Sequence, residues 1–145
     1  MDYIDTSVLL KAYVPEPDSE RFVTWADAVA TRCISPLSAV ELHCAIHRRQ
    51  RMGLLSLKQR TSAIEAFDAE VDADLYRVLP WPARGFDEGR AALENCRPIA
   101  LRALDALHLA VALHHRCTGF ATADRVQAQA ARRLGFKVQT FFLSA

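Results

Sequence analysis

Asp105 is a single carboxylate within residues 103–113, the most apolar run of this chain. The run is rich in helix-forming residues and is hydrophobic on nearly every side, so it predicts a helix buried in the core. An ionised carboxylate that loses its water there costs roughly several kcal/mol unless something compensates the charge. The compensation is a paired base, a proton or a bound cation, and each predicts a different kind of protein.

Three more acids lie at positions where the order of the predicted elements brings them near Asp105. Asp5 ends the first predicted strand and Asp124 follows the fourth. Glu41 lies on a helical stripe whose period is that of a buried face. That stripe comprises Leu37, Val40, Glu41, Cys44 and Ala45. Ligands bind at the carboxyl ends of the strands in an open parallel sheet, so we expect all four acids to converge on one pocket.

A divalent cation explains the four acids together. Two carboxylates about 4 Å apart repel by about 4 kcal/mol at an effective dielectric of about 20, and a divalent ion removes that repulsion. Ligands that are all oxygen favour Mg²⁺ or Mn²⁺ over zinc. Each acid also has a local alternative: a helix N-cap for Asp5 and for Asp124, the helix dipole or Arg102 for Asp105, and an ion pair with Arg48 for Glu41.

Predicted strands and helices alternate along the chain, often with two helices between strands. Such alternation favours a parallel sheet covered by helices on both faces. No linker or repeat interrupts the pattern, so we expect one domain over residues 1–145. The predicted strands span residues 3–5, 32–34, 75–79, 119–122 and 136–140. The predicted helices span residues 6–14, 18–30, 35–52, 56–73, 85–96, 101–116 and 124–134.

The composition is that of an ordinary globular protein, with 51% hydrophobic and 24% charged residues. A formal net charge of +1 gives no bulk signal for nucleic-acid binding. Fifteen arginines against three lysines suit phosphate contacts, although a GC-rich genome gives the same bias. The four cysteines form no C-x-x-C pair, which favours buried free thiols in a reducing cytoplasm. Without a membrane-length apolar run or a signal peptide, we expect a cytoplasmic protein with no membrane contact.

Four segments of the sequence carry a family resemblance. They are Met1-Asp-Tyr-Ile-Asp-Thr-Ser-Val-Leu-Leu10, Ser35-Pro-Leu-Ser-Ala-Val-Glu41, Leu104-Asp-Ala-Leu-His-Leu-Ala110 and Thr122-Ala-Asp-Arg125. In this order and spacing they resemble the PIN-domain ribonucleases, most closely the VapC toxins of bacterial VapBC toxin–antitoxin systems. Each segment alone is weakly specific, but the four together span essentially the whole chain and are specific.

The resemblance implies an α/β fold, a PIN-like three-layer α/β/α domain with a central parallel five-stranded sheet. It implies an endoribonuclease that depends on Mg²⁺, which Mn²⁺ can replace, and that leaves a 5′-phosphate and a 3′-hydroxyl. The implied catalytic acids are Asp5, Glu41, Asp105 and Asp124. Of these, Asp5, Asp105 and Asp124 would hold the metal. Two threonines beside the acids, Thr6 and Thr122, would orient waters or ligands.

The resemblance also implies partners. A VapB-like antitoxin would block the acidic pocket, the substrate would be tRNA, rRNA or mRNA, and the toxin would form a homodimer. A PIN-domain nuclease that processes RNA without an antitoxin is the alternative function. A phospho-acceptor receiver domain, from a different class, needs two adjacent acids near the first strand and a lysine after the last. Here Asp2 and Asp5 are separated, and Lys137 lies inside the final predicted strand.

Histidines and arginines near these acids have more than one interpretation. His43 and His47 are four residues apart on one helix, a zinc-like spacing, but no H-E-x-x-H motif surrounds them. We expect both on the solvated surface, and we expect His108, one turn after Asp105, in the core beneath the site. The basic cluster His47–Arg51 either complements the helix dipole at a C-terminus or contacts the RNA backbone.

Overall fold

Strand β1 lies at the centre of the sheet, with two strands on each side of it. The computed structural model describes residues 1–142, and the five strands within them are all parallel, in the order β3–β2–β1–β4–β5. They are β1 Asp2–Ile4, β2 Arg32–Ile34, β3 Arg77–Val78, β4 Gly119–Thr122 and β5 Lys137–Thr140. Because β2 and β4 flank β1 on opposite sides, the strand order switches between β1 and β4. A crevice opens at the carboxyl ends of strands at such a switch point.

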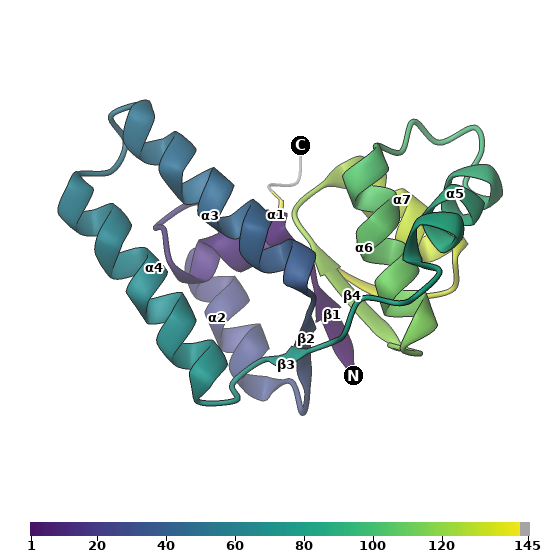
Figure 1. Ribbon diagram of the computed structural model, residues 1–145, viewed down its shortest axis with the longest axis horizontal. Coiled ribbons are helices and arrows are strands. Elements are labelled where there is room, and N and C mark those ends of the chain that lie inside the picture. The colour runs from purple at the N-terminus through teal and green to yellow at the C-terminus, as the bar shows by residue number, and fades with distance from the viewer. Residues whose placement is uncertain (143–145) are drawn as a thin grey trace.

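Helices cover both faces of this sheet, which confirms the predicted three-layer arrangement (Figure 1). One face carries α1 Thr6–Leu9, the 3₁₀ turn η1 Leu10–Ala12, α2 Ser19–Ala28, α3 Pro36–Arg51 and α4 Leu57–Asp72. The other face carries α5 Gly85–Asn95, α6 Ala103–His114 and α7 Arg125–Arg133. Within residues 1–142, no helix has the length and apolar character needed to cross a membrane.

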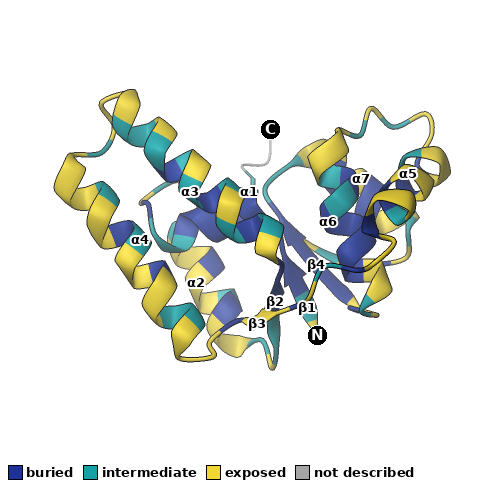
Figure 2. Cartoon of the chain, viewed as in Figure 1, coloured by how far each residue is buried: buried dark blue, intermediate teal, exposed yellow. Residues whose placement is uncertain are grey.

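Successive residues of the central strands supply the two cores. Tyr3 of β1 and Phe120 of β4 lie in the core shared with α6 and α7. Their neighbours Ile4 and Ala121 lie in the core shared with α1, α2, α3 and α4. This alternation follows from the two-residue period of a strand, and Figure 2 shows the central strands buried between the helical layers. Since both faces are covered, the carboxyl edge of the sheet is where polar side chains can gather.

Several predicted elements are shorter in the structure, and two of them differ in kind or in pairing as well as at their ends. The helix predicted over residues 6–14 ends as an α-helix at Leu9 and continues as the tighter turn η1. The strand predicted over residues 75–79 pairs with β2 only at Arg77 and Val78, on the edge of the sheet. The predicted stops at Gly53 and Gly135 are confirmed, because both glycines have the positive φ that ends a helix.

The buried face of α3 is not the one that the periodicity predicted. Ser38, Leu42 and Ile46 are buried, whereas Val40 is 68% exposed. Ser38 tolerates burial because it accepts a hydrogen bond from the Ser35 backbone N–H at 3.1 Å and closes the capping box of the helix. The predicted stripe therefore lies along the edge of the buried face, and Glu41 faces a cleft rather than the core.

Candidate active site

The four predicted acids line one cleft at the carboxyl ends of β1 and β4. The cleft has a volume of about 390 Å³ and lies between the start of α1, the wall of α3 and the start of α6. Thr6 also lines it, whereas Thr122 is fully buried beneath it. Three arginines border the same cleft. The cleft's charged residues are Asp5, Glu41, Arg48, Arg49, Arg102, Asp105 and Asp124.

Asp5 is held at the base of the cleft by donors on both carboxylate oxygens. Asp5 is the N-cap of α1, because its Oδ2 accepts a hydrogen bond from the Ser7 backbone N–H at 3.0 Å. The same oxygen accepts the Ser7 hydroxyl at 2.5 Å. Its Oδ1 accepts Nε2 of Gln127 at 3.0 Å. Asp5 is only 4% exposed. The N-cap alternative and the acidic cleft are therefore compatible, because one carboxylate performs both roles.

His108 lies fully buried beneath the cleft and connects Glu41 to the core, as predicted for a core histidine. Its Nε2 lies 3.2 Å from both Glu41 carboxylate oxygens and 3.8 Å from Asp5 Oδ1. Its Nδ1 lies 2.7 Å from the Tyr3 hydroxyl, which donates to Ser35 Oγ at 2.8 Å. Because that hydroxyl has one proton, Nδ1 must donate to it while Nε2 donates to Glu41. Burial lowers the pKa of His108, but the Glu41 hydrogen bond and the Asp5 charge outweigh burial and raise it.

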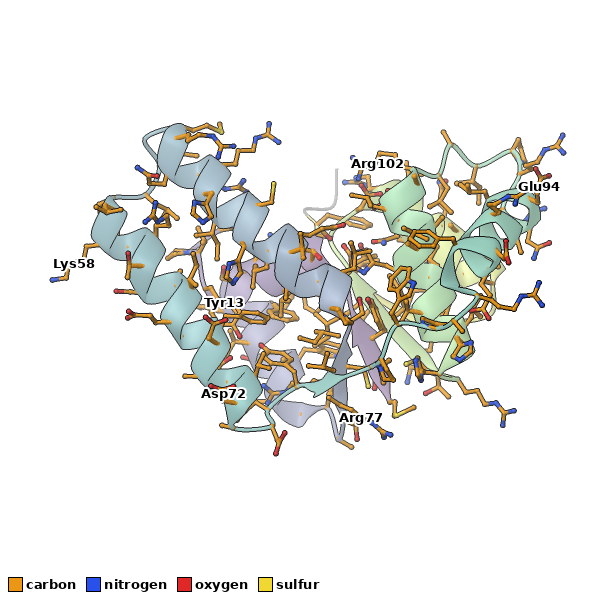
Figure 3. The ribbon with its side chains drawn as sticks, in the orientation of Figure 1. Tyr13, Lys58, Asp72, Arg77, Glu94 and Arg102 are labelled. Atoms are coloured by element: carbon orange, nitrogen blue, oxygen red, sulfur yellow. The ribbon has the colours of Figure 1, made fainter. Side chains whose placement is uncertain are left out.

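Arg102, the residue before α6, is labelled beside the start of that helix in Figure 3, and its side chain bridges the other two acids. Its Nε donates to Asp105 Oδ2 at 2.8 Å, and its Nη2 donates to Asp124 Oδ2 at 3.2 Å. The Arg102 side chain is 74% exposed, whereas that of Asp105 is 13% exposed. Burial raises the pKa of Asp105 by more than the Arg102 hydrogen bond lowers it. The pairing considered as a local alternative for Asp105 is therefore present alongside the convergence of acids.

Asp124 and Thr122 fix the start of α7. Asp124 Oδ1 accepts the Gln127 backbone N–H at 2.8 Å, so Asp124 is the N-cap. Thr122 Oγ1 accepts the Asp124 backbone N–H at 3.0 Å and donates to Gln127 Oε1 at 2.6 Å. Through Gln127 this chain of hydrogen bonds reaches Asp5. Thr122 thus orients the residues that hold two acids, without lining the cleft itself.

The basic cluster of α3 divides into residues with different surroundings. Arg49 donates through two nitrogens to Glu16, its Nε at 3.2 Å, and Lys11 Nζ lies 3.6 Å from the same carboxylate. These contacts fix the segment after η1 to the helix. Arg48 is exposed on the cleft wall and, within residues 1–142, forms neither the Glu41 ion pair considered above nor another one.

The donor chemistry of the cleft fits a hard divalent cation. The four acids supply only oxygen, the ligand type that Mg²⁺ and Mn²⁺ prefer. In the described part of the chain, no three acidic, histidine or cysteine side chains already have the spacing of a complete metal site. The guanidinium of Arg102 instead bonds one oxygen each of Asp105 and Asp124. A cleft that holds a positive charge between two carboxylates has the electrostatic character of a cation site.

Two site residues were not predicted from the sequence. Gln127 and Ser7 both donate to Asp5, from α7 and α1 respectively. Gln127 is fully buried beside Ala130 and Ala131, at the spacing of one helix face. A single polar residue on an apolar face is the signal that singled out Asp105, so the same reasoning could have found Gln127.

The histidines outside the cleft lie at the surface, as predicted, but only three of the four cysteines are the buried thiols that the sequence favoured. His43 lies 3.7 Å from Asp68 and His114 lies 3.0 Å from Glu88, each partly exposed at the surface. All four cysteines are free thiols; Cys44 is exposed and the other three are buried. Neither group forms a zinc site within residues 1–142.

The fold is all-parallel α/β/α, with a carboxylate cleft at the point where the strand order switches. This combination can be compared with known protein families. The PIN domain matches residues 3–133, so the chain belongs to the PIN-domain family. Over 144 residues, it is 29% identical to Ribonuclease VapC47 of Mycobacterium tuberculosis (strain CDC 1551 / Oshkosh), covering 94% of this chain and 93% of that protein.

Solved structures share the fold along the whole chain. The structure of FitAB bound to an IR36 DNA fragment matches with a TM-score of 0.74 and 22% identity, covering 100% of this chain and 99% of that one. VapBC2 from Rickettsia felis, bound to a DNA fragment from its promoter, matches with a TM-score of 0.66 and 18% identity, covering 97% and 99%. The predicted PIN-like fold is confirmed.

Proposed function

We propose that this chain is the toxin of a type II toxin–antitoxin system and acts as a Mg²⁺-dependent endoribonuclease. The observation that carries the proposal is the convergence of four carboxylates on one cleft at the switch point of the sheet. Membership of the PIN-domain family and similarity over nearly the whole chain to a protein named a ribonuclease support it.

Asp5, Asp105 and Asp124 would hold the cation, for which Mn²⁺ can substitute, and Glu41 would complete the site. The bound cation supplies charge neutralisation on the phosphate and activation of a water molecule. Ser7 and Gln127 hold the Asp5 carboxyl group in one orientation through three hydrogen bonds. These contacts are formed before substrate arrives, which is the condition for electrostatic preorganisation.

Glu41 depends on His108 for its place in this mechanism. Both Glu41 oxygens lie 3.2 Å from Nε2 of His108, so the buried imidazole holds the Glu41 side chain in place at the cleft wall. In the proposed hydrolysis, the water oxygen bonds to phosphorus and the bond from phosphorus to the 3′ oxygen breaks. The 3′ oxygen takes up a proton, leaving a 3′-hydroxyl on one fragment and a 5′-phosphate on the other.

RNA recognition would be local rather than driven by overall charge. The net charge is only +1, but Arg48 and Arg102 are exposed at the cleft. Planar guanidinium groups suit bidentate contact with phosphate oxygens. The cleft therefore offers cations at its rim for the flanking phosphates and carboxylates at its base for the metal.

The activity is tested with the purified chain and cellular RNA. We expect cleavage in Mg²⁺, none in EDTA, and recovery when Mn²⁺ is added after EDTA. The products should accept ligation that requires a 5′-phosphate, and sequencing those ends would identify the target RNA and cleavage site. Full activity in EDTA would contradict the metal mechanism.

We further propose a VapB-like antitoxin that blocks the cleft. The similarity in fold to the VapBC2 structure supports a two-component assembly. Co-expression with the product of the adjacent gene should give a complex that copurifies and no longer cleaves RNA. Failure to form a complex at micromolar concentration would favour the alternative, a PIN-domain nuclease that processes RNA without an antitoxin.

The proposal extends to assembly and location: one domain over residues 1–145, forming a homodimer in the cytoplasm, where its RNA substrates are. Val40 and Phe86 are 68% and 69% exposed and offer apolar surface for a contact between copies. Light scattering over a range of protein concentrations would measure the mass, and a monomer throughout would contradict the dimer.

A further inference from the structure

Arg102 makes contacts that the proposed reaction does not explain. Its guanidinium bonds Oδ2 of Asp105 at 2.8 Å and Oδ2 of Asp124 at 3.2 Å, and both residues are proposed metal ligands. The Asp105 hydrogen bond, followed by the negative charges of Asp105 and Asp124, raises the pKa of Arg102, so the side chain stays charged. A permanent cation of the chain thus holds oxygens that a divalent ion needs.

The arginine and a metal ion therefore compete for the same carboxylates. A divalent ion bound to Asp105 and Asp124 would repel a guanidinium that contacts both, and the shared Oδ2 atoms cannot serve both cations fully. Exposed ion pairs of arginine are weak, and the Arg102 side chain is 74% exposed. Metal binding should consequently displace Arg102 rather than be prevented by it.

Arg102 differs in this respect from the other arginines of the cleft. Arg49 is paired with Glu16, which is not a proposed metal ligand, so metal binding gives no reason for it to move. Arg48 forms no ion pair in residues 1–142. Among the cleft arginines of the described chain, Arg102 alone bonds proposed metal ligands.

We propose that Arg102 is a substrate-binding residue that metal binding releases from Asp105 and Asp124 to contact an RNA phosphate at the mouth of the cleft. The inference rests on the proposed function, because it requires both a metal and an RNA substrate. Once the two carboxylates are engaged by the metal, a phosphate in the cleft is the anion that a released guanidinium meets. Its planar donors suit two phosphate oxygens.

This arrangement couples the metal to the RNA. Coupling between two ligands is reciprocal, so RNA that draws Arg102 away from the carboxylates also makes metal binding tighter. Removal of Arg102 should then have opposite effects on the two ligands: tighter metal binding in the absence of RNA, and weaker RNA binding in the presence of metal. A residue with a merely structural role would weaken both.

The test compares Arg102→Ala with Arg97→Ala. Arg97 is a matched control because its side chain is 77% exposed and forms an ion pair with Glu94 at 3.3 Å, outside the cleft. The Mn²⁺ dissociation constant, measured by electron paramagnetic resonance without RNA, should fall about fivefold in Arg102→Ala. At saturating Mn²⁺, the KM for RNA should rise about tenfold with a smaller change in kcat. Arg97→Ala should match the wild type in both measurements.

Arg102→Lys provides a second variant that keeps the charge but not the planar fork. It should lie between the wild type and Arg102→Ala in both measurements. An unchanged Mn²⁺ dissociation constant in Arg102→Ala would overturn the competition, and an unchanged KM would overturn the RNA contact. A wild-type protein that neither binds Mn²⁺ nor cleaves RNA would instead overturn the proposed function, and this inference with it.

Discussion

The imidazole Nε2 of His108 lies 3.2 Å from both carboxylate oxygens of Glu41, although the two residues are 67 positions apart in the chain. This contact joins α6 to α3 beneath the cleft. Burial lowers the pKa of this imidazole, but the Glu41 hydrogen bond and the Asp5 charge outweigh burial and raise it, which favours the protonated ring beside these acids. It offsets part of their repulsion and fixes one catalytic acid of the proposed site.

The Tyr3→Phe variant tests the support beneath His108. It removes the hydroxyl that accepts from His108 and donates to Ser35, and it leaves both partners without that contact in a fully buried place. We expect a loss of about 1–3 kcal/mol in the free energy of unfolding, measured in urea with an unchanged slope. RNA cleavage under native conditions should also fall, because His108 no longer holds Glu41 in one orientation.

Tyr76→Phe is the matched control for Tyr3→Phe. Tyr76 is also buried, and its hydroxyl accepts from Tyr13 at 2.8 Å in the core on the opposite face of the sheet. It should lose stability without losing cleavage by the folded protein. Equal cleavage by the two variants would mean that the Tyr3–His108 contact serves the fold alone.

Gln127→Met tests the orientation of Asp5. Methionine keeps the length of the side chain but removes the donor 3.0 Å from Asp5 Oδ1. Loss of a group that orients a metal ligand costs about 10- to 100-fold in metal affinity or activity, so Mn²⁺ binding and kcat should fall within that range. Gln129→Met changes an exposed residue of the same helix and should leave both at wild-type values. A Gln127→Met enzyme with normal Mn²⁺ affinity and kcat would show that Gln127 does not orient Asp5 for metal binding.

Arg48→Ala tests the RNA-binding edge of α3. Arg48 is exposed at the cleft, whereas Arg51, one turn further along, is exposed but does not line it. We expect Arg48→Ala to weaken RNA binding and to reduce the slope of log affinity against log salt by about 0.7, the value for one phosphate contact to a single strand. If Arg51→Ala produced the same change, the two arginines would contribute through general charge rather than through the cleft.

The fold and the convergence of acids could be predicted because they follow from chain order. Asp5 and Asp124 follow strands that turn out to be neighbours at the switch point, so parallel topology alone brings them together. The helical period placed Asp105 correctly at the start of a largely buried helix. Each of these predictions depended only on the spacing of apolar residues along the sequence and on the strands running parallel.

The sequence could not reveal contacts that depend on tertiary partners. Ser38 is buried because Ser35 and Tyr3 satisfy its hydroxyl, so the apolar stripe of α3 predicted the wrong face. The partner of Glu41 is His108, 67 residues away, rather than the nearby Arg48 that helix spacing suggested. Likewise, Arg102 reaches Asp124, 22 residues further along, only because α6 and α7 start at the same edge of the sheet.

The most direct test of the carboxylate–metal site is RNA cleavage by Asp105→Asn in Mg²⁺, with Asp87→Asn as the control. Asp87 lies on α5, is 58% exposed and does not line the acidic cleft. Asparagine keeps the shape of residue 105 but removes the charge that the metal needs, so cleavage should fall on the order of a thousandfold. The melting temperature should show that the variant remains folded, and Asp87→Asn should cleave like the wild type. A folded Asp105→Asn protein that cleaves RNA at the wild-type rate would contradict the carboxylate–metal site.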